Sequence, residues 1–271
     1  ADEIFGGYNV YSDPGSTSYE KLPRSLRRGI MHIAESLPAH RGVNFFVRKG
    51  KDLEERFIGN AYMFTPKDRK ALLKIHTNAP DPMAITKPYY DQVKDQDDVT
   101  KMQYLDLHLW MAGDILLKAD KMSMANSLEL RVPFLDKEVM ALAQRIPTRY
   151  RVIHKPSESG GTPYITKYAM RLAAKKDTPP QTAKTAAKKK LGFPVPIRVW
   201  LKEDTYYNMV KNTFEGNAAQ QFFHTEKLVQ LLNDHRAGKA DNSRKIWTVY
   251  MFLVWYHVYF ESDVIPTKPN V

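Results

Sequence analysis

The apolar residues of this chain recur mostly at helical spacing. Near its middle they are separated by four, three and four positions, at Leu105, Leu109, Ala112 and Leu116. This stripe predicts a long central helix packed along one face, with residues 89–98 forming its start. Similar patterns predict helices over residues 21–37, 52–61, 65–76, 137–145, 166–176, 197–202, 208–214, 226–236 and 243–260.

Capping and breaking residues mark where several of these helices begin and end. Thr65 and Pro66 are an N-cap and a first helical residue, and Asp136 is an N-cap for the helix over 137–145. Because proline restricts the residue before it, we expect Val132-Pro133 to end the central helix.

Few segments predict anything other than helix. The stretch 41–51 is basic and contains glycines, so we expect a loop, and the stretch 150–153 predicts a short strand. Residues 154–163 hold Ser, Gly and Pro without an apolar pattern, which predicts another loop. We therefore expect a mostly α-helical chain forming a single domain over residues 1–271.

Charge and composition restrict the function classes. The net charge of +11 indicates anionic partners, without choosing among phosphates, nucleic acid and acidic proteins. The absence of cysteine excludes disulfides, thiolate metal sites and a cysteine nucleophile within this chain. The most apolar stretch, 246–260, contains Thr248 and His257 and is too short to span a bilayer, so we expect no membrane partner and a cytoplasmic protein.

The first candidate site is the pair of adjacent carboxylates Asp2 and Glu3, followed by Gly6-Gly7. Magnesium takes one or two carboxylates and completes its octahedron with water and phosphate oxygens, so this pair is a candidate metal site. An ordinary solvated terminus is the alternative interpretation.

The second candidate site lies on the central helix. Asp114 and Lys118 are one turn apart and share a face, while Asp120 lies on the opposite side. Charges buried on a helix need partners, so the alternative to a ligand site is an internal salt-bridge network. We interpret Glu129 and Arg131 as structural in either case.

The third candidate is Lys190, which precedes a rigid Gly192-Phe193-Pro194 turn. A lysine held there can be directed as a point charge at phosphate oxygens. We interpret Lys184, Lys188 and Lys189 as a solvated basic helix face. Phe193 is the one aromatic residue nearby, so specific nucleic-acid recognition is not favoured.

Three segments in this order, ADEIFGGY, GDILLKADKMSMANSLELRVPFLD and KKLGFPVPIRVWL, resemble the synthetase domain of glutamine-dependent asparagine synthetases of the bacterial B type. The resemblance implies the C-terminal helical portion of an α/β, adenine-nucleotide α-hydrolase-like domain. The glutaminase and the pyrophosphate-loop half of that family are absent from this chain. It begins inside the first motif, so we expect a fragment that is inactive by itself.

The implied activity is ATP-dependent amidation of aspartate to asparagine through a β-aspartyl-AMP intermediate. Its cofactors would be ATP and Mg²⁺, and its partners aspartate, ATP and ammonia released from glutamine by a domain outside this chain, in a protein able to form a homodimer. A related adenylating enzyme, such as a β-lactam synthetase, and a basic anion-binding module are the alternatives. The segment SLELRVPFLD, residues 127–136, favours the asparagine synthetases.

The resemblance also implies roles for individual residues. Asp2 and Glu3 match the acidic pair that meets Mg²⁺ and pyrophosphate. Asp114 matches an acidic residue that shapes the synthetase site, and Lys118 falls where the family keeps a basic residue. Lys190 would stabilise the negative charge that builds on the α-phosphate and on the leaving pyrophosphate.

Overall fold

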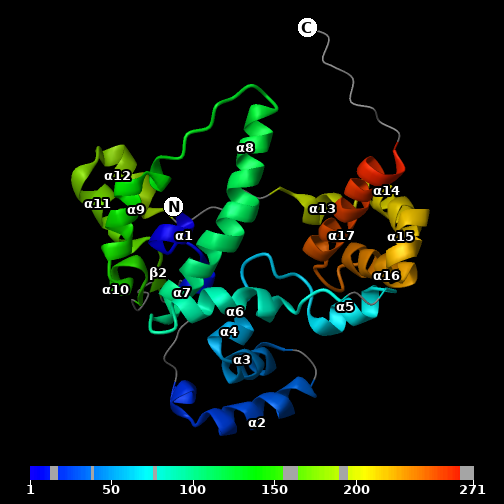
Figure 1. The fold of residues 1–271 in the computed structure, drawn as a ribbon, viewed down its shortest axis with the longest axis horizontal. Helices are drawn as coiled ribbons and strands as arrows, with labels where there is room; N and C mark the ends of the chain where they lie inside the picture. The colour runs from blue at the N-terminus through cyan, green and yellow to red at the C-terminus, as the bar shows by residue number, and fades with distance from the viewer. Residues whose placement is uncertain (13–17, 38–39, 76–77, 155–163, 189–194, 263–271) are drawn as a thin grey trace. The chain divides into compact units, whose positions relative to one another are not determined.

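A computed structural model describes residues 1–12, 18–37, 40–75, 78–154, 164–188 and 195–262 of the chain. Most of these residues are helical, as predicted (Figure 1). Their contacts divide the chain into unit 1, residues 1–61 and 80–190, and unit 2, residues 62–79 and 191–271. The single domain expected over residues 1–271 stays a prediction, because contacts alone do not separate two domains from two units of one domain.

The first part of unit 1 is built of short helices. They are α1 (Asp2–Phe5), two 3₁₀ turns (Asn9–Ser12 and Ser18–Lys21), α2 (Arg24–Glu35), α3 (Arg41–Gly50) and α4 (Leu53–Arg56). The predicted loop over 41–51 is wrong, because α3 occupies it and buries Val43. The prediction interpreted Gly50 as a loop residue, but this glycine allows α2 and α3 to pack closely. A Cβ at position 50 would lie 2.5 Å from the Cβ of Met31.

The central helix of unit 1 is real, but its ends differ from the prediction. It comprises α7 (Asp98–Leu105), a π-helical segment (Asp106–Leu116) and α8 (Leu117–Met124) without interruption. The predicted start at 89–98 is wrong, because a separate helix, α6 (Pro82–Gln92), ends there and Asp97 caps α7.

The end of the central helix is set by backbone geometry and not by proline. Ser127 adopts a left-handed φ of 54°, and the amide of Leu128 donates to the carbonyl of Ser123. This is the pattern of a Schellman termination. The predicted stop at Val132-Pro133 is therefore wrong, and Pro133 instead begins a 3₁₀ turn, Pro133–Leu135.

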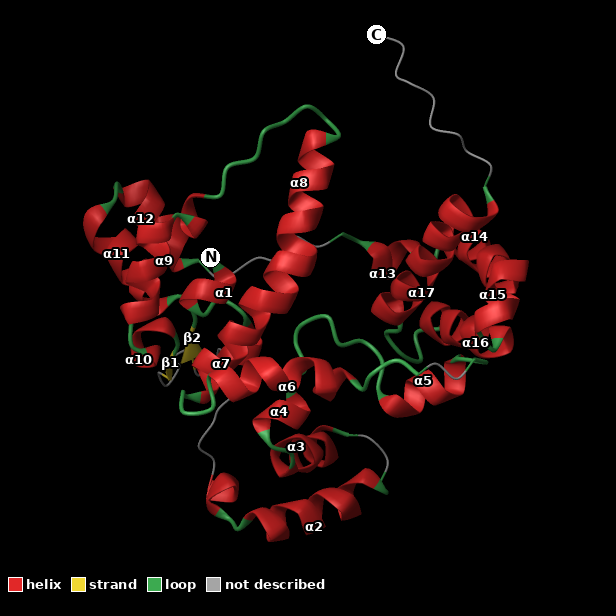
Figure 2. Ribbon diagram, in the orientation of Figure 1, coloured by secondary structure: helices red, strands yellow, loops and turns green. Residues whose placement is uncertain are grey.

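The rest of unit 1 follows in a series of short elements. They are α9 (Lys137–Arg145), α10 (Thr148–Arg151), β1 (Ile153–His154), β2 (Tyr164–Ile165), α11 (Tyr168–Asp177) and α12 (Pro180–Ala187). Asp136 caps α9 as predicted, accepting from the amide of Glu138 at 2.8 Å. The predicted strand over 150–153 is mostly α10, with β1 pairing antiparallel to β2 in the one sheet among the described residues (Figure 2).

Unit 2 is a cluster of helices with its own apolar core. Its elements are α5 (Pro66–Leu72), α13 (Ile197–Trp200), α14 (Asp204–Glu215), α15 (Asn217–Phe222), α16 (Thr225–Arg236), α17 (Ser243–Tyr256) and a final π-helical turn (His257–Glu261). The core contains Phe214, Leu228, Leu232 and Ile246. As predicted, Thr65 caps the N-terminus of α5. At its C-terminus the carbonyl of Leu72 accepts a hydrogen bond from the amide of His224.

The apolar helix predicted over 243–260 is confirmed, although it is buried along one face only. Ile246, Val249 and Leu253 lie in the core, whereas Trp247 and Trp255 are exposed. No helix among the described residues combines the length and the apolar character needed to cross a membrane.

The cap at Asp136 generates a stability prediction. We expect Asp136→Ala to lower the free energy of unfolding by about 1 kcal/mol, because the first amides of α9 lose their acceptor. Asp136→Asn should retain most of the stability, since its side-chain oxygen can accept the same bond. Urea denaturation measures both, with the exposed Asp120→Ala as control. Equal losses in Asp136→Ala and Asp120→Ala would contradict the capping role.

Candidate functional site at the first helix

The first helix directs its two adjacent carboxylates into different surroundings. Asp2 and Glu3 both lie in the first turn of α1. The side chain of Asp2 is about a quarter exposed, at 26%, whereas Glu3 is buried with 4% of its surface exposed. Successive residues of a helix point about 100° apart, which explains why the two carboxylates differ in access to solvent.

Asp2 meets a lysine from a distant part of the chain. The ammonium of Lys167 lies 3.1 Å from Asp2 Oδ1, and the backbone amide of Lys167 donates to the carbonyl of Gly6 at 3.2 Å. Lys167 has φ 52° and ψ 39°, a left-handed conformation that costs about 1 kcal/mol or more outside glycine. Contacts with the surrounding residues must maintain this left-handed conformation. Backbone strain of this kind is found preferentially at functional sites.

The Gly6-Gly7 turn makes room for this pair. Gly6 has a left-handed φ of 72°. A Cβ on Gly7 would lie 1.9 Å from Asp2 Oδ1 and 2.4 Å from Lys167 Cε, well inside contact distance. Both glycines are therefore required by the geometry that brings Asp2 and Lys167 together.

Glu3 is held inside by a chain of hydrogen bonds. The hydroxyl of Tyr8 donates to Glu3 Oε1 at 2.6 Å, and the indole of Trp110 donates to Tyr8 at 3.2 Å. Gln103 donates to the Glu3 carbonyl at 2.6 Å and accepts from Arg151 at 2.9 Å. These contacts fix α1 against the central helix and direct the Glu3 carboxylate into the protein.

A second buried carboxylate, Asp106, was not among the predicted site residues. It is completely buried, and its Oδ2 accepts from the hydroxyl of Tyr11 and, at 2.6 Å, from the amide of Asn60. Its Oδ1 has no hydrogen-bond partner among the described residues. Burial raises the pKa of Asp106 to about 6, against the hydrogen bonds from Tyr11 and Asn60, which lower it. The sequence signal was a lone Asp inside an apolar stripe, where the π-helical segment begins.

The charges of the central helix are not buried. Lys118 and Asp114 form an ion pair of 3.7 Å, with 60% and 43% of their side chains exposed, and Asp120 is exposed. Glu129 and Arg131 form another exposed pair. The expected burial of these charges is wrong, and the described residues contain no internal salt-bridge network there. The apolar stripe packs on one face and leaves the charged face to solvent.

The predicted site residues are thus only partly brought together. Asp114 and Lys118 pair with each other, while Asp2 pairs with Lys167. Lys190 and the turn at 192–194 lie outside the described residues. Lys184 is described, and it is exposed on α12, as a solvated basic face requires. No sequence pattern identified Lys167, because its link to Asp2 exists only through the fold.

Asp2 fits a magnesium ion better than Glu3 does. Magnesium is held by one or two carboxylates together with water and substrate phosphates. Asp2 is partly open to solvent and can offer an oxygen to such an ion, whereas Glu3 is buried and bound by Tyr8. Among the described residues, no three His, Cys, Asp or Glu side chains form a group that could hold a metal alone. A metal at Asp2 would therefore need further ligands from outside these residues, such as water or a bound phosphate.

Comparison with known proteins gives one consistent result. A family model described as asparagine synthase matches residues 1–257. The chain is 44% identical over 270 residues to asparagine synthetase (glutamine-hydrolyzing) 1 of Bacillus subtilis, across 99% of this chain and 41% of that protein. It is 38% identical over 274 residues to putative asparagine synthetases (glutamine-hydrolyzing) of Mycobacterium bovis and Mycobacterium tuberculosis, across 98% of this chain and 39% of theirs. The chain thus spans about two fifths of the length of these relatives. No solved structure matches it.

The buried Asp106 generates a pH prediction. Its folded pKa, about 6, lies above its ordinary value of 3.8, so ionisation of Asp106 destabilises the folded state. This cost is absent below pH 4, grows between pH 4 and 6, and reaches roughly 3 kcal/mol above pH 6. Asp106→Asn should remove it, because asparagine keeps an oxygen for Tyr11 and Asn60 but carries no charge.

Urea denaturation from pH 4 to pH 7 measures this effect. The stability of Asp106→Asn relative to the natural chain should rise across that range, and that of the exposed control Asp114→Asn should not. A difference between Asp106→Asn and the natural chain that stays constant with pH would contradict the assignment.

Proposed function

This chain belongs to the asparagine synthase family, and we propose that it forms the C-terminal part of the synthetase domain of a glutamine-dependent asparagine synthetase. In this proposal its helices are the C-terminal helical portion of an α/β, adenine-nucleotide α-hydrolase-like domain. The complete protein converts aspartate to asparagine at the expense of ATP, in the cytoplasm, and a homodimer is its proposed assembly.

The proposed reaction has two steps. The β-carboxylate of aspartate attacks the α-phosphorus of ATP, and pyrophosphate leaves. Ammonia, released from glutamine by a domain outside this chain, then attacks the β-carbonyl carbon of aspartyl-AMP, and AMP leaves together with a proton from the attacking nitrogen. The first step builds negative charge on the phosphates, so the protein must supply cations and direct them before the reaction begins.

The pairing of Asp2 with Lys167 is the single observation that carries this proposal. It brings together a carboxylate and a cation, each about a quarter exposed, beside a buried glycine turn. Magnesium bound there would neutralise phosphate charge and hold pyrophosphate in position. Asp2 is the proposed ligand from this chain. Glu3, bound by Tyr8, serves better to hold α1 in place than as a second ligand.

Lys190, Asp114 and Lys118 keep their proposed roles. Lys190 stabilises the charge on the α-phosphate and the leaving pyrophosphate. Asp114 and Lys118 help to shape the site, and their exposure leaves them accessible to substrate or to other parts of the complete protein. Lys167 joins them as a positioning residue that orients the Asp2 carboxylate.

The role of Lys190 is tested in the complete protein that contains this chain. Lys190→Gln should slow aspartate-dependent pyrophosphate release by about a hundredfold to a thousandfold, because a preorganised charge acts mainly on the transition state. Lys184→Gln, which removes an exposed lysine from α12, is the matched control and should retain activity. Unchanged pyrophosphate release in Lys190→Gln would refute this role.

The role of Lys167 is tested in the same assay. Lys167→Gln should lower kcat on the order of a hundredfold, because a misplaced Asp2 no longer orients the reacting phosphates. Lys167→Arg should recover part of that loss, since arginine can still pair with Asp2. The control is Lys175→Gln, an exposed lysine of α11. A loss of folding stability in Lys167→Gln with kcat unchanged would reduce Lys167 to a structural role.

A further inference from the structure

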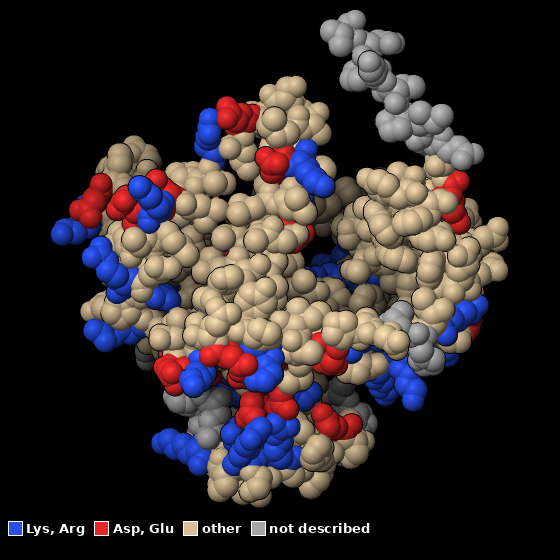
Figure 3. Space-filling view, in the orientation of Figure 1, with Lys and Arg blue, Asp and Glu red and all other residues tan. Residues whose placement is uncertain are grey.

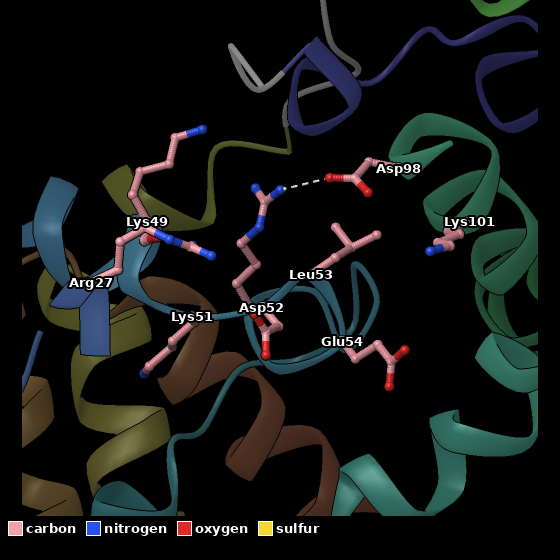
Figure 4. A pocket seen from close by; sticks show the side chains of 9 residues that line it. Arg27, Lys49, Lys51, Asp52, Leu53, Glu54, Asp98 and Lys101 are labelled. Carbon is pink, nitrogen blue, oxygen red and sulfur yellow. Dashed lines mark hydrogen bonds and ion pairs between the residues drawn. The ribbon is translucent and has the colours of Figure 1, made fainter. Parts of the chain in front are cut away.

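A separate cavity in unit 1 is lined mainly by charged side chains. It has a volume of about 400 Å³ and lies among residues of α2, α3, α4 and α7 (Figure 4). Its positive residues are Arg27, Lys49, Lys51, Arg56 and Lys101. Figure 3 shows Lys and Arg side chains gathered together with Asp and Glu over the part of unit 1 that holds α2, α3 and α4. The charge balance of the cavity therefore depends on how these groups pair.

Two of its three carboxylates are already neutralised by arginine. Asp52 accepts from Arg24 and, at 3.2 Å, from Arg28, neither of which lines the cavity. Asp98 pairs with Arg56 at 3.2 Å. Glu54 is the third carboxylate, and Figure 4 shows its carboxylate on the side away from Arg27. The cavity thus retains positive charge that its own carboxylates do not cancel.

Arg27 is held in position without a carboxylate partner. Its Nε donates to the carbonyl of Leu22 at 3.3 Å and its Nη1 to the carbonyl of Lys49 at 3.0 Å. These carbonyls orient the guanidinium but do not neutralise it. The remaining Nη2 has no acceptor among the described residues, so an oriented donor is left for a ligand.

Lys101 adds charge to the same cavity. It projects from α7, and its ammonium has no hydrogen bond or ion pair with the described residues. The other two lysines of the lining have partners elsewhere: Lys49 is buried at 2% exposure and already engaged, and Lys51 is paired with Glu35 at 3.7 Å.

We propose that this cavity binds a small anion carrying one or two phosphate groups. Arg27 supplies oriented N–H donors, and Lys101 supplies a point charge, a combination suited to phosphate oxygens. Leu53 is the one apolar residue of the lining, so the cavity offers little for a nucleobase or an apolar ligand. Its residues are distinct from Asp2, Lys167 and Lys190, so it does not depend on the proposed reaction.

The test uses the complete protein, without magnesium and at low ionic strength, with inorganic phosphate and pyrophosphate as probes. Acetylation of individual lysines is followed by mass spectrometry. Pyrophosphate should protect Lys101 selectively, while the exposed Lys94 of the same unit reacts as before. Orthophosphate should protect Lys101 at higher concentration. Equal protection of Lys101 and Lys94, or protection by any salt at equal ionic strength, would overturn the proposal.

Calorimetry with variants locates the binding. Lys101→Gln should raise the Kd for pyrophosphate about tenfold, the change expected when one charge-assisted contact is lost. Lys94→Gln is the matched control and should bind as the natural chain does. Arg27→Gln should weaken binding similarly, but it also removes a hydrogen bond to the carbonyl of Lys49 and can disturb the fold. Lys101→Gln is therefore the deciding variant. A Kd unchanged in Lys101→Gln would place any binding elsewhere and overturn the proposal, whereas loss of pyrophosphate release in Lys190→Gln leaves it untouched.

Discussion

A side chain at position 7 would fill the space in which Asp2 meets Lys167. This steric limit links the elements around the candidate site. The short helix α1 ends at a left-handed Gly6, the carbonyl of Gly6 accepts from the amide of Lys167, and Lys167 begins α11 in a strained conformation. A residue with a Cβ at position 7 would separate the carboxylate from its cation. The site therefore depends first on the absence of a side chain.

Burial of polar groups holds α1 against the central helix. Glu3 is bonded through Tyr8 to Trp110, and its carbonyl is bonded through Gln103 to Arg151. A buried carboxylate is costly unless it is hydrogen-bonded, so this network specifies one position for α1 and not several. Asp106 follows the same rule only in part, since one of its oxygens stays without a partner among the described residues. Burial of this carboxylate raises its pKa, and the hydrogen bonds from Tyr11 and Asn60 offset only part of that rise.

The two charged regions of unit 1 differ in how their charges are compensated. At α1, one carboxylate faces one lysine across a glycine turn, which suits a ligand bound through a metal. In the cavity beside α3, Asp52 is neutralised by Arg28, which lies outside the lining, and Asp98 is neutralised by Arg56 of the lining. Arg27 is instead oriented by backbone carbonyls. That arrangement suits direct contact with an anion. Net charge did not distinguish these situations, because it counts charges without their partners.

The sequence by itself determined features that arise within a few residues. The apolar period of the central helix and the caps at Thr65 and Asp136 were predicted correctly, because each depends on neighbours within one helical turn. The three motifs likewise predicted Asp2 as a site residue, and that role stays a prediction. Only the tertiary structure decided the rest. In the folded chain Gly50 lies at a contact between two helices and not in a loop, and Asp106 is buried. Asp114 and Lys118 are exposed to solvent, and Lys167 pairs with Asp2. Such pairings join residues far apart in the chain, and no local pattern encodes them.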